Sequence, residues 1–180
     1  QLQCVHTRHP GWCELTAPFH QLGLNPILNH YPDAIIVHTH RAPMSFVASG
    51  CSFSELLRRS GSDHIDKHEI GCDWMDMLEI YTRTFEADRA LLEPQHPGQF
   101  IDLQHDDFVA NPWPGIESIY NDRGAPLTTD ARGQMQAWLD DHPQGKHGKH
   151  EYRLEDYGIK RAEVEKLFAD YVARYQLTMD

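Results

Sequence analysis

The chain has 180 residues, of which 40% are apolar, and its formal net charge is −11 at neutral pH. This length suits one domain with a single buried core. The acidic excess is spread over every segment, which excludes a nucleic-acid-binding surface because such a surface needs clustered Lys and Arg.

The first third of the chain predicts two strands and two helices. Residues 12–16 form a short predicted strand, and the leucines within residues 20–30 predict a helix. Residues 34–38 are an apolar, β-branched run, typical of a strand that is buried on both faces of a parallel sheet. Pro43 then suits the first turn of a helix predicted over residues 44–59.

Helices dominate the rest of the pattern. The predicted elements are a long helix over 70–92, a short strand over 99–103, a helix over 111–122, a helix capped by Thr128 or Thr129, and an amphipathic helix over 160–175. Strands that alternate with helices indicate an α/β architecture with a parallel sheet. Ligands of such sheets bind beyond the carboxyl ends of the strands.

The loop over residues 38–43 lies at the carboxyl end of the best predicted strand. Arg41 in this loop precedes Ser49 by eight residues, about two helical turns. An arginine fork and a hydroxyl at this spacing are able to hold one phosphate group. In the alternative, Arg41 pairs with a nearby acid and Ser49 packs within the helix. Spacing alone favours this alternative.

His38 and His40 form an HxH pair in the same region. Residues two apart in a strand share one face, so both rings are able to bind one metal ion. A metal-dependent hydrolase would need further ligands, for which Asp106 and Asp107 are candidates. A single HxH pair is weak evidence, and purely structural histidines are the commoner case.

Two further segments have the composition of binding or catalytic sites. Lys146, His147 and Gly148 lie in a loop of glycines and cations that is able to surround an anion, although most such loops are solvated surface. His20 follows Pro18 near the first predicted strand, where it would serve as a general base or pack against the next helix.

The chain ends and the cysteines bear on organisation and compartment. Because the sequence opens at Gln1 with neither a methionine nor a secretion signal, we expect residues 1–180 to be one domain that is N-terminally incomplete. No apolar run approaches the roughly 20 residues that cross a bilayer, so no transmembrane segment is expected.

The four cysteines lack CxxC spacing, which favours a reducing, cytoplasmic setting. An apolar helix face leaves a homo-oligomer open.

Several short segments, in a fixed order, resemble a known family. They are Ala17-Pro18-Phe19-His20, Tyr31-Pro32-Asp33-Ala34, His38-Thr39-His40-Arg41-Ala42-Pro43, Val47-Ala48-Ser49, Asp106-Asp107-Phe108, and Gly145-Lys146-His147-Gly148-Lys149-His150. Each is common alone, but in this order they resemble the bacterial branch of the sulfotransferases that use 3′-phosphoadenosine 5′-phosphosulfate (PAPS). The likeness runs from about Trp12 to the C-terminus.

The resemblance implies a P-loop-like three-layer α/β fold with a parallel sheet, here mostly its helix-rich C-terminal part. It implies that Arg41 and Ser49 hold the 3′-phosphate of PAPS, and that Lys146, His147 and Gly148 close over the same phosphate. His20 matches a histidine beside the acceptor. The family's glycine-rich 5′-phosphosulfate loop is expected upstream of Gln1.

The implied activity is transfer of a sulfuryl group from PAPS to a hydroxyl of a small-molecule, glycan or lipid acceptor, with no metal required. Two alternatives stay open: a metal-dependent hydrolase that uses His38 and His40, and a non-catalytic module that keeps the sulfotransferase core for binding.

Overall fold

Two parallel strands lie at the centre of the structure, a computed structural model that describes residues 13–143 and 153–180. β1 (Ile36–His40) pairs along its whole length with β2 (Phe100–Gln104), with Ile36 opposite Phe100 and His40 opposite Gln104. The strands are separated in sequence by two long helices, as parallel pairing requires. The expected α/β class, helix-rich with a parallel sheet, is confirmed.

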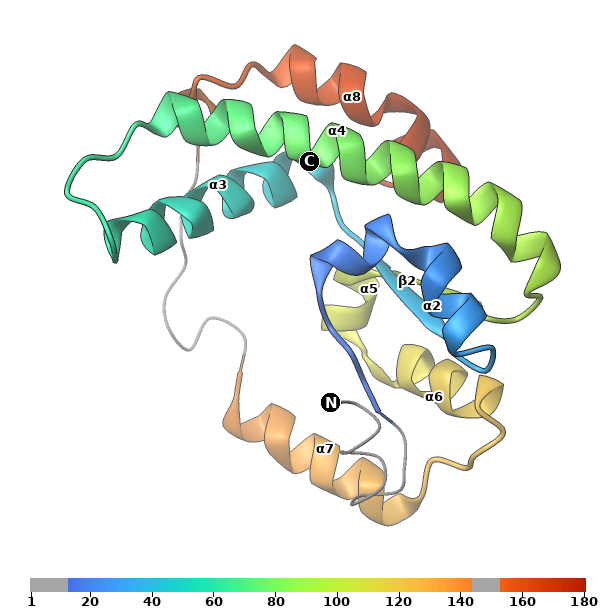
Figure 1. Ribbon diagram of the computed structural model, residues 1–180. Helices are drawn as coiled ribbons and strands as arrows, with labels where there is room; N and C mark the ends of the chain where they lie inside the picture. The colour runs from blue at the N-terminus through green and yellow to red at the C-terminus, as the bar shows by residue number, and fades with distance from the viewer. Residues whose placement is uncertain (1–12, 144–152) are drawn as a thin grey trace.

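Helices make up most of the described chain (Figure 1). The α-helices are α2 (Leu24–His30), α3 (Pro43–Arg59), α4 (Lys67–Leu92), α5 (His105–Ala110), α6 (Trp113–Asp122), α7 (Thr129–Asp141) and α8 (Arg161–Tyr175). Short 3-10 turns occur at η1 (Pro18–Leu22), η2 (Glu93–Gln95) and η3 (Leu154–Tyr157). No helix in the described ranges has both the length and the apolar character needed to span a membrane.

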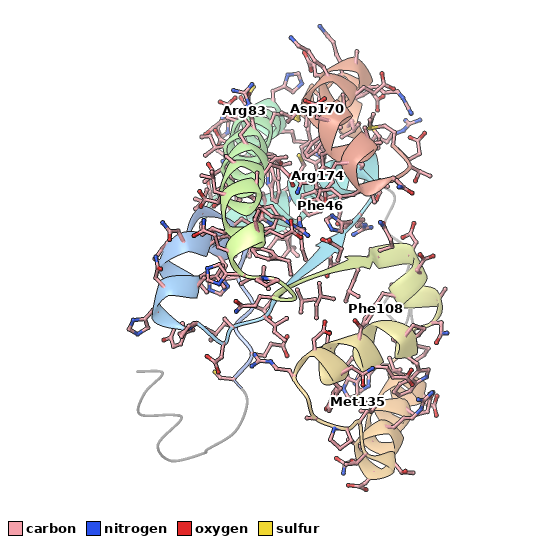
Figure 2. The ribbon with its side chains drawn as sticks, turned by 90° about the vertical axis from the view of Figure 1, so that its right-hand side faces the viewer. Phe46, Arg83, Phe108, Met135, Asp170 and Arg174 are labelled. Carbon is pink, nitrogen blue, oxygen red and sulfur yellow. The ribbon has the colours of Figure 1, made fainter. Side chains whose placement is uncertain are left out.

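The sheet lies between two groups of helices. Alternate residues of β1, among them His38 and His40, contact aromatic side chains of α4 and α8. On the opposite face α6 packs against β2 at Gly115, where an added Cβ would lie 3.0 Å from Leu103. Figure 2 shows the strands between α4 and α8 on one side and α6 and α7 on the other. This arrangement places helices on both faces of the sheet.

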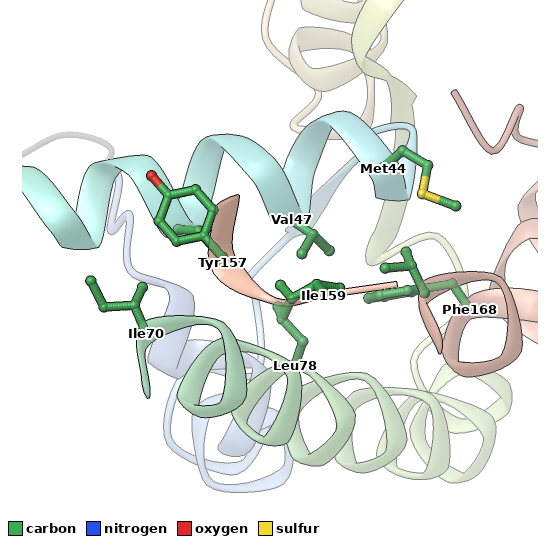
Figure 3. Packing of buried hydrophobic residues seen from close by; sticks show 9 residues of the cluster. Met44, Val47, Ile70, Leu78, Tyr157, Ile159 and Phe168 are labelled. Atoms are coloured by element: carbon green, nitrogen blue, oxygen red, sulfur yellow. The ribbon is translucent and has the colours of Figure 1, made fainter. Parts of the chain in front are cut away.

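The main hydrophobic core lies between α3, α4 and α8 (Figure 3). Its fully buried members include Val47 of α3, Ile70 of α4 and Val164 of α8. Gly50 lets α3 approach α4, because a Cβ there would come within 2.6 Å of the Trp74 ring. This packing holds the start of α3 firmly at the end of β1.

Several local predictions differ from the structure. The strand predicted over 12–16 is wrong, because residues 13–16 have no regular structure. The helix predicted over 20–30 is two elements, η1 and α2, which meet at Gly23 in a non-helical conformation. β1 begins and ends two residues later than the predicted strand, so both histidines of the HxH pair lie within it.

Candidate functional site

Arg41 stands at the junction between β1 and α3. It directly follows the last strand residue, and α3 begins two residues later with Pro43, whose fixed φ suits a first helical turn. The Arg41 side chain is half-buried, and its Nε donates a hydrogen bond to Ser45 Oγ at 3.2 Å. The guanidinium is therefore held beside the N-terminal end of a helix, where the helix dipole favours anions.

Arg41 differs from Arg58 and Arg89 in its partners. Arg58 contacts Asp73 at 2.6 Å and Arg89 contacts Asp102 at 2.6 Å, whereas no carboxylate of the described residues lies within 4.0 Å of the Arg41 guanidinium. The alternative considered from the sequence, in which Arg41 pairs with a nearby acid, is not observed among the described residues. Within the described ranges both Nη groups keep their donors for another ligand.

Ser49 lies on the same face of α3 as Ser45, one turn further along. Its side chain is half-buried, and its hydroxyl has no hydrogen-bond partner among the residues that the structure describes. Arg41, Ser45 and Ser49 thus form a row of polar groups along the first two turns of α3. Such a row is able to bind a phosphate through a cation and a neutral donor.

The remaining predicted site residues are not brought into this row. His20 is half-buried in η1, which packs on α4, and no hydrogen bond or ring contact of the described residues joins it to Arg41 or Ser49. Lys146, His147 and Gly148 lie outside the described residues.

His38 and His40 share one strand face, as predicted, with ring centroids 4.2 Å apart. His40 is only 1% exposed. Its two ring nitrogens are used by Tyr171 Oη at 2.8 Å and by Asp102 Oδ1 at 2.7 Å. Asp102, in β2 opposite His38, is the third member of the only cluster of potential metal ligands found within 13–143 and 153–180.

The charges around this cluster do not suit a metal cation. The buried guanidinium of Arg89 donates to both oxygens of Asp102, at 2.6 and 2.7 Å, so a divalent ion bound there would face a fixed positive charge. Burial acts to raise the pKa of Asp102, but the hydrogen bonds from Arg89 and His40 outweigh it and lower that pKa. The carboxylate therefore stays ionised as part of a hydrogen-bonded network. The structure favours this structural role of the cluster over the metal site of a hydrolase.

Sequence reasoning missed Asp102 and Arg89 and proposed Asp106 and Asp107 in their place. Asp106 contacts His105, and it lies in α5, beyond the end of β2. The available signal was the period-two pattern of residues 100–104, which makes Asp102 the one acidic residue within the second strand.

Comparisons with known proteins agree with the fold. A family model described as "Sulfotransferase family" matches residues 2–130. The chain belongs to the sulfotransferase family, and the resemblance inferred from the sequence is confirmed.

Two solved structures resemble the chain. The crystal structure of sulfotransferase STF9 from Mycobacterium avium is 24% identical, with a TM-score of 0.85 over 99% of this chain and 45% of that one. The crystal structure of sulfotransferase STF1 from Mycobacterium tuberculosis H37Rv is 31% identical, with a TM-score of 0.71 over 87% of this chain and 39% of that one. The chain therefore spans less than half the length of either structure. No curated protein matches the sequence.

Proposed function

We propose that this chain supplies the 3′-phosphate part of the donor site of a PAPS-dependent sulfotransferase. The observation that carries the proposal is the Arg41 guanidinium, which lies at the carboxyl end of a parallel strand with no carboxylate partner in the described ranges. Ligands of parallel α/β sheets bind at this end of the strands. Arg41 would hold two phosphate oxygens through its Nη groups, and Ser49 would donate its hydroxyl to a third.

Local charge supports this role in an acidic protein. The chain carries a net charge of −11, so its overall field repels a nucleotide with several negative charges. A binding site for such a nucleotide must therefore contain cations that nearby acids do not neutralise. Arg41 meets this requirement, whereas Arg58 and Arg89 do not.

The proposed reaction is sulfuryl transfer to a hydroxyl of a small-molecule, glycan or lipid acceptor. The acceptor oxygen forms a bond to sulfur in line with the breaking bond between sulfur and the bridging phosphate oxygen. A base, for which His20 is our candidate, takes the hydroxyl proton. Adenosine 3′,5′-bisphosphate leaves with the electron pair of the broken bond, and cations stabilise its developing charge. Lys146, His147 and Gly148 are our candidates for residues that close over the 3′-phosphate.

The test is calorimetric titration of adenosine 3′,5′-bisphosphate into the 180-residue chain. Arg41→Ala removes two charge-assisted hydrogen bonds, so we expect its affinity to fall at least about tenfold. Ser49→Ala removes one neutral donor and should weaken binding by about 3- to 10-fold. The matched control is Arg83→Ala, which removes an exposed arginine of α4 whose ion pair among the described residues is with Glu79.

The control variant should bind as the unmodified chain does. Absence of binding to the unmodified chain, or equal affinity for the unmodified chain and Arg41→Ala, would contradict the proposal.

A further inference from the structure

Ser45 lies between Arg41 and Ser49 and makes two hydrogen bonds in a defined direction. Its Oγ donates to the carbonyl oxygen of Ala42 at 3.3 Å and accepts from Arg41 Nε at 3.2 Å. The hydroxyl has one proton, and Ala42 accepts it, so an Oγ lone pair faces Arg41. The serine therefore connects the first turn of α3 to the guanidinium.

This connection restricts the guanidinium without using the donors that bind phosphate. Of the nitrogens of a guanidinium, Nε is the one nearest the aliphatic stem, and holding it fixes the plane of the whole fork. Because Ser45 is neutral, it leaves the positive charge of Arg41 intact. An arginine is rich in rotamers, and fixing it before the ligand binds lowers the entropy that binding would otherwise cost.

We propose that Ser45 is a positioning residue that orients the Arg41 fork toward the 3′-phosphate of the donor nucleotide. This inference rests on the function proposed above and deepens it, since it assigns the orientation of the binding arginine to a residue that the sequence analysis did not single out. Ser45 itself touches no ligand in this scheme.

The test is a double-mutant cycle with adenosine 3′,5′-bisphosphate as the titrated ligand. Ser45→Ala should weaken binding by about 3- to 10-fold, the range expected when one hydrogen bond is lost. The same substitution in the Arg41→Ala background should change the affinity by less than about twofold, because no fork is left to orient. Ser45→Thr retains a hydroxyl and should restore most of the affinity.

Ser60→Ala is the matched control for a purely local effect on α3. The Ser60 hydroxyl donates to the carbonyl of Leu57, also three residues earlier, just past the far end of α3, and no arginine of the described ranges is its partner. Ser60→Ala should leave the nucleotide affinity unchanged. The thermal midpoints of both alanine variants should stay close to that of the unmodified chain.

The outcomes separate the two proposals. If Arg41→Ala weakens binding and Ser45→Ala does not, the positioning role is overturned and the proposed function stands. If Ser45→Ala weakens binding equally with and without Arg41, Ser45 acts independently of the fork and the inference is wrong. If the unmodified chain does not bind the nucleotide, the proposed function fails and this inference fails with it.

Discussion

Burial of His38 among aromatic rings couples the stability of the protein to pH. Its ring lies 4.3 Å from that of Phe85 and 4.2 Å from that of His40, and its Nδ1 is buried without a hydrogen-bond partner in the described part of the chain. Burial, assisted by the neighbouring His40, lowers the pKa of His38 from 6.5 to about 3. In the unfolded chain the ring recovers its ordinary pKa.

The direction of the pH effect follows from these two pKa values. Between pH 6.5 and 3 the unfolded state binds a proton at His38 that the folded state does not. The contribution of His38 to stability is therefore complete above pH 6.5 and is lost as the pH falls toward 3. The loss amounts to about 1.4 kcal/mol for each pH unit in this window.

His38→Phe should remove this part of the acid sensitivity. A phenyl ring fits an aromatic environment and has no nitrogen to desolvate. Urea unfolding at pH 7.5 and pH 5.5 should show a smaller loss of unfolding free energy in the variant than in the unmodified chain, by about 1 kcal/mol. His64→Phe, at an exposed position, should retain the pH dependence of the unmodified chain. Parallel pH profiles for His38→Phe and the unmodified chain would refute the assignment.

At the scale of elements, Gly71 determines how closely α4 approaches η3. A Cβ added at this position would overlap the carbonyl oxygen of Tyr157, and backbone atoms cannot move aside as a flexible side chain can. The site lies beside Ile70 and Ile159, both buried in the main core. The absence of a side chain at residue 71 is therefore a packing requirement.

Gly71→Ala should destabilise the protein although alanine is the better helix former. Overpacking at a backbone contact is expected to cost about 1–3 kcal/mol in the free energy of unfolding, which outweighs the gain in helix propensity. The matched control is Gly133→Ala in α7, where no atom of the described residues lies within 4 Å of the added Cβ. This control should gain about 0.5–1 kcal/mol. Equal midpoints of urea unfolding for the two variants would disprove the packing argument.

The helices and strands themselves were largely accessible from the sequence. The β-branched run of residues 34–38 predicted a buried strand, and β1 is present with a shift of two residues. α4 begins at Lys67, before its apolar stripe, because the Asp66 side chain accepts from the N–H groups of His68 and Glu69. The predicted helix over 20–30 is interrupted because Gly23 leaves the helical conformation.

The candidate site was accessible only in part. The spacing of Arg41 and Ser49 was compatible with a phosphate site but alone favoured the alternative, and only the family resemblance assigned the two residues to a phosphate. Neither reveals whether an acid neutralises the arginine. That depends on which residues the fold brings near the end of β1. The pairing of Asp102 with Arg89 and His40 also depends on the register of β2 and on the packing of α4, which no local pattern encodes.

At the scale of the whole molecule, Arg89 joins three elements that are distant in sequence. From α4 it donates to Asp102 in β2 at 2.6 Å and to Tyr175 in α8 at 3.3 Å. Asp102 in turn contacts His40 of β1 at 2.7 Å, one residue before Arg41. The network thus ties the end of β1, where the proposed donor site lies, to the helices that cover the sheet.

Arg89→Met should destabilise the protein strongly while conserving most of the side-chain volume. The substitution leaves the ionised Asp102 next to a buried apolar group, and removing one partner of a buried charge pair typically costs about 3–5 kcal/mol. The Asp102 side chain is 38% exposed, and water offsets part of this loss, so we expect the lower end of that range. Urea unfolding at pH 7.5 measures the difference. Arg83→Met is the matched control, because its pair with Glu79 lies on the surface with the arginine side chain 78% exposed, and its effect should stay below about 1 kcal/mol. If the two methionine variants unfold at the same urea concentration, the Arg89 network contributes no more to stability than a surface ion pair does.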